Sequence, residues 1–358
     1  MRTTARFWLA LALGAFASAC NHDSTAPITP TLKSGQVEAE DSGDEDGFTL
    51  AVIGDTPYGD VKLAEFPDLV ALINADPAVQ MVLHLGDIKA GKNSPCTNAY
   101  FDNIRKLFDT FSDPLVYTPG DNEWTDCHVA TKNNGLFTPT ERLIAVRKKF
   151  FPVSGQTLGI NSTHVLSQAT DPAYSDFIEN VFFKRAHVVF AAINLPGSND
   201  DLTSWGLPLP ADAGNYPTQA QEVAGRDAAN AAWLDFTFAR ARQNHAAAVV
   251  LLFQADMWDP AEPLSGYNDI VRHIGTLAAQ FGGPVLLLEG DSHSFNVAHP
   301  FSVASPYYSL HPSTPVVPNV TRIVVEGSDK GRTEYLRLHI NPARNLPSPF
   351  SWERVPLH

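Results

Sequence analysis

Four apolar segments of this chain end in the dipeptide Gly-Asp, and this repeated ending constrains the fold more than any other feature. The four dipeptides are Gly54-Asp55, Gly86-Asp87, Gly120-Asp121 and Gly290-Asp291. A fifth apolar segment leads to Asp256. A single Gly-Asp carries no information, because both residue types favour turns. Four of them after short apolar runs predict strand ends at one edge of an α/β fold, where ligands bind.

The segments between these endings alternate in character, as expected for an α/β protein. Continuously apolar runs, typical of strands covered on both faces, predict strands at 48–53, 80–85, 114–118, 187–193, 246–253 and 284–288. Helices are predicted at 60–74, 98–110, 139–151, 219–242 and 270–279. Thr218 and Gln221 are placed as a capping box for the fourth of these helices.

The last third of the chain changes pattern. Strands predicted at 321–325 and 335–340 have no helix between them, so we expect an antiparallel edge or hairpin that closes the domain. Residues 194–216, rich in Gly, Pro, Asp and Asn, are expected to form a long loop. No second boundary is visible within 47–358, which is predicted to be one domain.

Composition excludes two classes of protein. With 358 residues, of which 44% are hydrophobic, the chain can bury a sizeable core, and this excludes global disorder. The net charge of −14 argues against nonspecific nucleic-acid binding, which relies on basic patches that neutralise phosphates. We therefore expect no nucleic-acid partner.

Residues 1–46 are expected to lie outside this domain. Arg2 and Arg6 precede a short apolar stretch, and small residues then lead to Cys20, a pattern typical of a bacterial export signal that ends in a lipidated cysteine. An ordinary signal peptide with a coincidental cysteine is the alternative. Residues 21–46 are polar, end in an acidic run and are predicted to be a disordered tether. The predicted location is the periplasm or the cell surface, with membrane contact only through lipidated Cys20.

Cys96 and Cys127 remain as an even pair of cysteines. Both lie in loops just after predicted strand ends, and an exported protein folds in an oxidising compartment. We predict a disulfide between them. Two separate buried thiols are the alternative.

Five short blocks resemble, in order and spacing, the calcineurin-like metallophosphoesterase superfamily. The blocks are Asp55-Thr56-Pro57, Gly86-Asp87, Gly120-Asp121-Asn122-Glu123, Gln254 or Asp256, and Gly290-Asp291-Ser292-His293. The corresponding family motifs are D-x-H, G-D, G-N-H-[DE], a lone histidine and G-H-x-H. The resemblance covers residues 48–340 and implies a four-layer α/β/β/α sandwich with mixed sheets.

The resemblance also implies one or two divalent metal ions. One site would use Asp55, Asp87 and His293. The other would share Asp87 as a bridge and add Asp121, Asp291 and either Gln254 or Asp256. Because carboxylates replace several of the family's imidazoles, Mn, Mg or Ca are favoured over Zn or Fe.

Departures from the family motifs affect the expected chemistry. Pro57 stands where the family has a histidine ligand, and Tyr58 or a water would fill that position. Asn122 takes the catalytic position of the histidine that protonates the leaving group, and an amide supplies no proton. His128, six residues later, is the nearest candidate acid, with an uninvolved surface histidine as its alternative.

Further residues beside the blocks have expected roles in substrate binding, in the core or in support of a ligand. Tyr58, Lys89 and Trp124 are candidates for substrate binding, whereas a solvated lysine and a packed tryptophan are the alternatives for the last two. His84 is expected to be a core histidine. Glu123 is expected to support a ligand residue rather than to bind metal itself.

The expected function is metal-dependent hydrolysis of a small phosphoester, as a phosphomonoesterase or phosphodiesterase outside the cytoplasm. The missing histidines favour an alternative, a non-catalytic metal- or ligand-binding module on the same fold. A third interpretation, a surface adhesin or structural lipoprotein without metal, leaves the strand-end aspartates unexplained.

Overall fold

The computed structural model describes residues 47–92, 94–129, 137–206, 208–342 and 348–357. The predicted export signal, the tether at 21–46 and Cys20 lie outside the described residues and stay predictions. Within the described part, no helix has both the length and the apolar character that crossing a bilayer requires.

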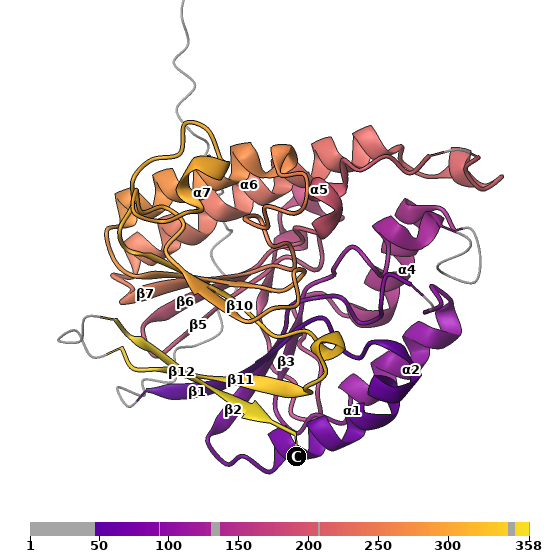
Figure 1. Cartoon of the computed structure of the whole chain (residues 1–358), viewed down its shortest axis with the longest axis horizontal. Coiled ribbons are helices and arrows are strands. Elements are labelled where there is room, and N and C mark those ends of the chain that lie inside the picture. The colour runs from indigo at the N-terminus through magenta and orange to yellow at the C-terminus, as the bar shows by residue number, and fades with distance from the viewer. Residues whose placement is uncertain (1–46, 93, 130–136, 207, 343–347, 358) are drawn as a thin grey trace, which may run out of the picture. The chain divides into compact units, whose positions relative to one another are not determined.

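The first sheet has five strands in the order β12-β11-β1-β2-β3 (Figure 1). Its parallel strands are β1 (Phe48–Ile53), β2 (Val79–His84) and β3 (Leu115–Tyr117). Helices α1 (Gly59–Asn74) and α2 (Asn98–Phe108) supply the crossovers that parallel neighbours need. β11 (Glu334–Ile340) and β12 (Phe350–Pro356) complete the sheet in antiparallel pairing.

The second sheet has seven strands in the order β4-β5-β6-β7-β8-β10-β9. Its parallel strands are β6 (Val188–Ala192), β7 (Ala248–Leu252), β8 (Val285–Glu289) and β10 (Val320–Val324). Its antiparallel edges are β4 (Leu166–Ser167), β5 (Val181–Arg185) and β9 (Asn296–Ala298). α6 (Gln219–Gln243) and α7 (Asn268–Phe281) provide its crossovers.

The remaining helical elements lie in the connections between strands. α4 (Pro139–Phe150) follows β3, and α5 (Gly197–Asp201) follows β6. Single 3₁₀ turns lie at η1 (Thr125–His128), η2 (Gln168–Thr170), η3 (Pro172–Tyr174), η4 (Ala213–Asn215), η5 (Ser265–Tyr267), η6 (Tyr308–Leu310) and η7 (Ser328–Lys330).

Each sheet packs against the other sheet on one face and against helices on the other. On β7, Val249 and Leu251 join the core under α6 and α7, whereas Val250 and Leu252 join the core between the sheets. The first sheet packs in the same way against α1, α2 and α4 (Figure 1). Because side chains alternate along a strand, burial on both faces explains why these strands are apolar throughout. The protein is therefore an α/β fold with two mixed sheets.

Most of the predicted elements are confirmed. Every strand and helix predicted from the sequence is present, with each end within two residues of its predicted position. The capping box is also confirmed, since Gln221 N donates to Thr218 Oγ1 (3.3 Å) and Thr218 N donates to Gln221 Oε1 (2.9 Å).

The antiparallel edge expected near the end of the chain is present, whereas its alternative, a hairpin of the last two predicted strands, is not. β10 and β11 form no hairpin with each other, because β10 is parallel to β8 and β11 is antiparallel to β1 in the other sheet. The antiparallel partner of β11 at the edge is β12, which the sequence analysis missed. The loop predicted at 194–216 contains α5 and η4.

Candidate metal centre

Carboxylates from both sheets converge where four strands end. Asp55, Asp87 and Asp121 follow β1, β2 and β3 of the first sheet, and Asp291 follows β8 of the second. The aspartates therefore come from the strand ends of both sheets rather than from the edge of a single sheet. Asp55, Asp87 and Asp121 are only 0%, 1% and 7% exposed.

These side chains form two groups that could hold a metal ion. The first ligand set is Asp55, Asp87 and His293, and the second ligand set is Asp87, Asp121 and Asp291. Within each set, one ligand atom from every residue lies within 4.8 Å of the others. Asp87 belongs to both sets, as expected for a residue that bridges two cations. Sets this rich in carboxylate oxygen suit hard divalent cations.

The Gly-Asp sequence has a steric explanation at Gly120. A Cβ atom at this position would lie 2.1 Å from Asp87 Oδ1, so any other residue would displace the carboxylate. The aspartates contribute a second feature, because Asp55, Asp87 and Asp291 have φ angles of 50°, 58° and 71°. Aspartate is one of the few residues found repeatedly in this left-handed region. Each of these three strands thus turns sharply at its end.

Burial and mutual repulsion disfavour the charged forms of these carboxylates. Burial raises the pKa of Asp55 to about 6 and the pKa of Asp121 to about 7, with the Asp126 charge adding to the second shift. Burial, followed by the charge of Asp121, raises the pKa of Asp87 and that of Asp291 well above the usual range. A divalent cation would reverse this preference, because it stabilises the ionised carboxylates.

Tyr58 lies among the atoms of the first ligand set. Its hydroxyl donates to Asp87 Oδ2 (2.7 Å) and lies 3.4 Å from Asp55 Oδ1 and 3.3 Å from His293 Nε2. Asn122 Nδ2 donates to the same Asp87 oxygen (2.6 Å) and to the Tyr58 hydroxyl (3.0 Å). Both residues therefore contact the side chain that the two sets share.

His293 is oriented by a residue that the sequence analysis missed. Its Nδ1 lies 3.0 Å from Asp329 Oδ2, while its Nε2 faces Asp55 Oδ1 at 3.5 Å. A carboxylate on one ring nitrogen commonly fixes the other for metal binding. The His293 side chain is 21% exposed, so the first ligand set reaches solvent on this side.

Gln254 and Asp256, both predicted as possible ligands, have other partners. Gln254 presents its amide nitrogen to Asp121 Oδ1 (3.3 Å) and Asp291 Oδ1 (3.1 Å), so it orients carboxylates instead of adding an oxygen ligand. The carboxylate of Asp256 forms a buried ion pair with Arg322. Because a buried arginine needs carboxylate partners, Asp256 is held outside both ligand sets, and only its backbone N–H reaches Asp291 (3.1 Å).

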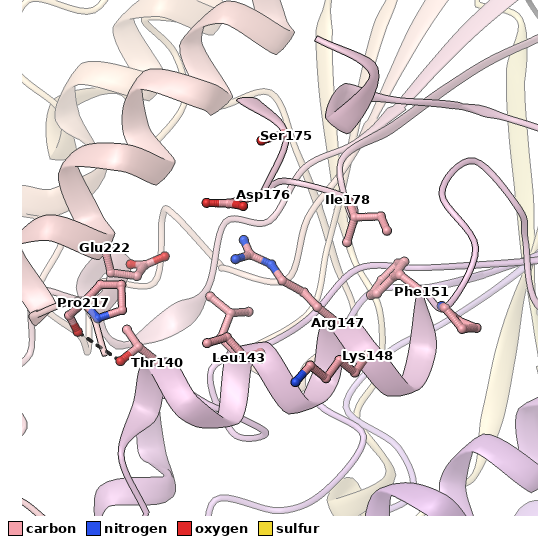
Figure 2. A pocket seen from close by; sticks show the side chains of 12 residues that line it. Thr140, Leu143, Arg147, Lys148, Phe151, Ser175, Asp176, Ile178, Pro217 and Glu222 are labelled. Carbon is pink, nitrogen blue, oxygen red and sulfur yellow. Dashed lines mark hydrogen bonds between the residues drawn. The ribbon is translucent and has the colours of Figure 1, made fainter. Parts of the chain in front are cut away.

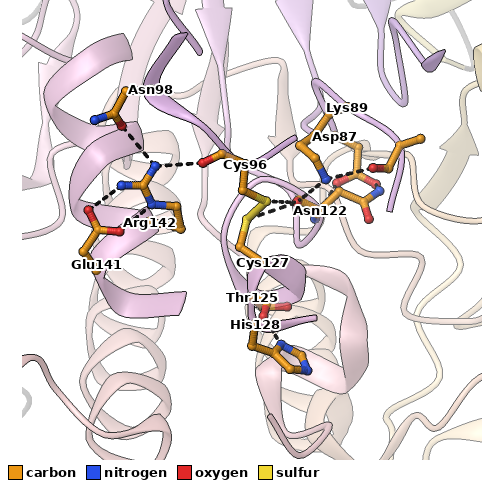
Figure 3. Close-up of a disulfide and its surroundings, with 11 residues drawn as sticks. Asp87, Lys89, Cys96, Asn98, Asn122, Thr125, Cys127, His128, Glu141 and Arg142 are labelled. Atoms are coloured by element: carbon orange, nitrogen blue, oxygen red, sulfur yellow. Dashed lines mark hydrogen bonds and ion pairs between the residues drawn. A yellow bond between two sulfur atoms is a disulfide. The ribbon is translucent and has the colours of Figure 1, made fainter. Parts of the chain in front are cut away.

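Three other candidate residues are buried or hydrogen-bonded to other groups. Lys89 is buried and donates to the backbone carbonyls of Ala90 (2.8 Å) and Asn122 (3.0 Å), so it is neither solvated nor open to a phosphate. Trp124 is 0% exposed and belongs to the packed interior. His128 contacts the carbonyl of Thr125 (2.7 Å) and lies on the side of Cys127 away from Asp87 (Figure 3), which does not suit a general acid.

Two buried residues hold the loops that carry the ligands. Glu123 Oε1 accepts hydrogen bonds from Asp87 N (3.2 Å), Gly120 N (2.7 Å) and the Tyr117 hydroxyl (2.7 Å), and it thereby holds the backbone of two of these loops. His84 Nδ1 accepts from Gly86 N (3.2 Å), and its Nε2 faces the carbonyl of Thr56 (2.9 Å). Burial lowers the pKa of His84 to about 4, so this core histidine is neutral.

Comparison with known proteins assigns no family. No family model matches the chain, and no curated protein matches it. Among solved structures, one described as "GAP50 the anchor in the inner membrane complex of Plasmodium" aligns with a TM-score of 0.42 and 8% identity, over 87% of this chain and 89% of that chain. A likeness this distant carries no functional argument.

The predicted disulfide between Cys96 and Cys127 is present and lies beside the candidate metal centre (Figure 3). The two sulfur atoms are 3.8 and 3.6 Å from the backbone oxygen of Asn122, the oxygen that also accepts from Lys89. The disulfide therefore packs against the loop that places Asn122 on Asp87. Disulfides of this kind are typical of oxidising compartments.

Reduction of this disulfide is expected to lower the free energy of unfolding by about 3–4 kcal/mol, because the bridge closes a loop of 31 residues. Urea unfolding with and without a phosphine reductant measures the change. The double variant Cys96→Ala/Cys127→Ala is the control, since the reductant should not affect it. An identical unfolding midpoint for reduced and oxidised protein would rule out this contribution.

A separate cavity of about 540 Å³ lies between α4 and α6 (Figure 2). Leu143, Phe151 and Ile178 form its apolar lining, and Thr140 donates to the carbonyl of Pro217 (3.0 Å) at one end. Arg147 also lines it but is held by Glu179 through two hydrogen bonds (2.6 and 2.9 Å). Neither ligand set contributes to this cavity, and we assign it no function.

Proposed function

We propose that this chain is an exported, metal-dependent hydrolase of small phosphate esters and a divergent calcineurin-like metallophosphoesterase with a four-layer α/β/β/α sandwich. The observation that carries the proposal is the position of Asp87, which belongs to two ligand sets at once. Membrane anchoring through lipidated Cys20 is part of the same proposal, and the disulfide supports export.

The residues present fit one or two hard divalent cations. Four carboxylates and one imidazole provide the donors, and a bound cation would offset the burial that raises the pKa values of Asp55 and Asp121. Mn²⁺, Mg²⁺ or Ca²⁺ suit this donor set better than Zn²⁺ or Fe. When bound, such ions would polarise the phosphoryl oxygens and activate the attacking water.

The chain's own residues would bind and orient the ester. Asp87 would join the two sites, and Glu123 would fix its backbone. The Tyr58 hydroxyl and the Asn122 amide donate to Asp87, and they would become donors for a bound phosphate if a cation took their place on that carboxylate. Because Asn122 cannot protonate a leaving group and His128 points elsewhere, we propose that the substrates are esters with good leaving groups, such as aryl phosphates.

A non-catalytic metal-binding module is the second candidate. The amide of Asn122 at the expected proton-donor position favours it, as does the Tyr58 hydroxyl, which already bonds to Asp87 within the first ligand set. Such a module would keep the cation affinity of the aspartates and would turn over no ester.

Turnover of p-nitrophenyl phosphate and bis(p-nitrophenyl) phosphate separates these candidates. Chelator-treated protein should be inactive and should regain activity with Mn²⁺, Mg²⁺ or Ca²⁺. His293→Ala removes a proposed ligand and should lower the activity at least about 100-fold. His273→Ala is the control and should leave the activity unchanged, because His273 lies on α7 and contacts Asp235 on α6. Retained cation binding without turnover on either ester would favour the module.

A further inference from the structure

The first two residues of α5 contact residues of the second ligand set, directly or through Gln254. Ser198 Oγ lies 2.8 Å from Asp121 Oδ2, to which it donates, and 3.2 Å from Asp126 Oδ1. Gly197 N donates to Gln254 Oε1, and the other end of the Gln254 amide bonds to Asp121 and Asp291. Two adjacent residues of α5 thus control, directly or through Gln254, both carboxylates that are unique to the second set.

The backbone of this segment is strained. Ser198, Asn199 and Asp200 have φ angles of 53°, 57° and 60° with ψ between 38° and 45°, and Asp201 has φ 58°. The left-handed conformation costs about 1–2 kcal/mol for a general residue and less for asparagine and aspartate, so the cost here is largest at Ser198. Strain of this kind persists where the surrounding structure enforces it, and it gathers at functional sites.

Contacts from two other elements enforce the turn. Arg226 on α6 is fully buried, pairs with the carboxylate of Asp200 and donates to its carbonyl (3.0 Å). Asn199 Oδ1 accepts from Gly266 N (2.8 Å), and the Tyr267 hydroxyl donates to the carbonyl of Pro196 (3.1 Å). The segment is therefore held in one position relative to the carboxylates.

Gly197 leaves a space that a side chain would fill. A Cβ atom there would lie 2.8 Å from Asp121 Oδ2 and 2.8 Å from Asp291 Oδ1, between the two carboxylates of the second set. Oxygen ligands lie about 2.1–2.6 Å from hard divalent cations, so the methyl group would crowd the volume that a cation needs. The φ of Gly197 is outside the left-handed region, so space rather than backbone conformation calls for glycine here.

We propose that the turn at residues 197–201 determines whether the second ligand set binds its cation. Gly197 provides the room for that ion, and Ser198 is a positioning residue that orients Asp121. The inference rests on the proposed metal centre and adds residues that tune the second of its two sites. The atoms nearest a Cβ at Gly197 belong to Asp121 and Asp291, and Ser198 donates to Asp121 and Asp126, none of which is in the first ligand set.

The test is the Mn²⁺ stoichiometry of the full-length protein and of two matched glycine variants. Wild-type protein should bind two ions by calorimetry and elemental analysis and should show the electron paramagnetic resonance signal of a coupled pair. Gly197→Ala should bind one ion and lose the coupled signal. Gly214→Ala is the control, because its Cβ in η4 would meet no atom within 4 Å, and it should behave as wild type.

Ser198→Ala provides a second variant that adds no atom to the site. It should weaken the second ion about 10- to 100-fold, as expected when a residue that orients a ligand is lost, and should leave the affinity for the first ion within about twofold. Ser204→Ala, in the same loop, is its control. This comparison decides the matter if circular dichroism shows that Gly197→Ala does not fold.

The outcomes separate the inference from the proposed function. Two Mn²⁺ ions with a coupled signal in folded Gly197→Ala would overturn the inference and leave the metal centre intact. One ion in both wild type and Gly197→Ala would also overturn it. No Mn²⁺ in folded wild-type protein would contradict the proposed function itself.

Discussion

Replacing Asp87 by asparagine is expected to abolish cation binding at both ligand sets and to lower ester turnover about a thousandfold or more. Asp87 is the residue shared by the two sets, and its Oδ2 receives both the Tyr58 hydroxyl and the Asn122 amide. Cations in such sites supply several kcal/mol of transition-state stabilisation, and about 4 kcal/mol corresponds to a thousandfold change in rate.

Calorimetric titration with Mn²⁺ and the aryl phosphate assay measure these two losses. Asp269→Asn is the matched control, since the Asp269 side chain is 91% exposed on α7 and pairs only with Arg272 among the interactions described. It should match wild type in both assays. Ester turnover by Asp87→Asn at the wild-type rate would contradict the metal-dependent mechanism.

Manganese is expected to raise the melting temperature by about 5 °C or more at pH 8, and by much less at pH 5. A free Mn²⁺ concentration a hundred times the dissociation constant adds about 2.7 kcal/mol to the free energy of unfolding. Each kcal/mol raises the melting temperature by about 2 °C in a chain of this size. The ion binds ionised carboxylates, so its affinity falls as protons compete at lower pH.

The metal-free protein should show the opposite pH dependence. Asp55 and Asp121 have pKa values raised to about 6 and about 7, against about 3.9 in an unfolded chain. Between these values the folded state binds more protons, so their contribution to stability is present below pH 4 and is lost as the pH rises through 6 and 7. Thermal melts from pH 5 to pH 8, with chelator or with Mn²⁺, should therefore diverge. Parallel curves would show that no cation engages these carboxylates.

Sequence patterns predicted the central strands because burial on both faces leaves a clear signal. β7 and β8 are apolar at almost every position, since one face meets helices and the other meets the opposite sheet. The same property hides which sheet a strand joins, and the wrong hairpin of β10 and β11 followed from this. β12 was missed because its residues are mostly exposed or half-buried at a sheet edge.

Of the candidate site, the sequence predicted the residues that belong to the repeated Gly-Asp motif. The Gly-Asp motif identified Asp55, Asp87, Asp121 and Asp291. Close packing at Gly120 requires glycine, and the left-handed turns favour aspartate, so both requirements are visible in the sequence. No sequence pattern identifies Ser198 and Asp329, because they reach the candidate centre through tertiary contacts from segments distant in the chain. The sequence could not exclude Asp256 as a ligand either, because its partner Arg322 lies 66 residues away.

Anomalous diffraction from crystals grown with Mn²⁺ tests the central claim most directly. The account predicts an anomalous peak on each side of the Asp87 carboxylate, each about 2.0–2.6 Å from a carboxylate oxygen, with His293 beside the first and Asp291 beside the second. Well-ordered density for all four aspartates with no anomalous peak next to Asp87 would contradict it.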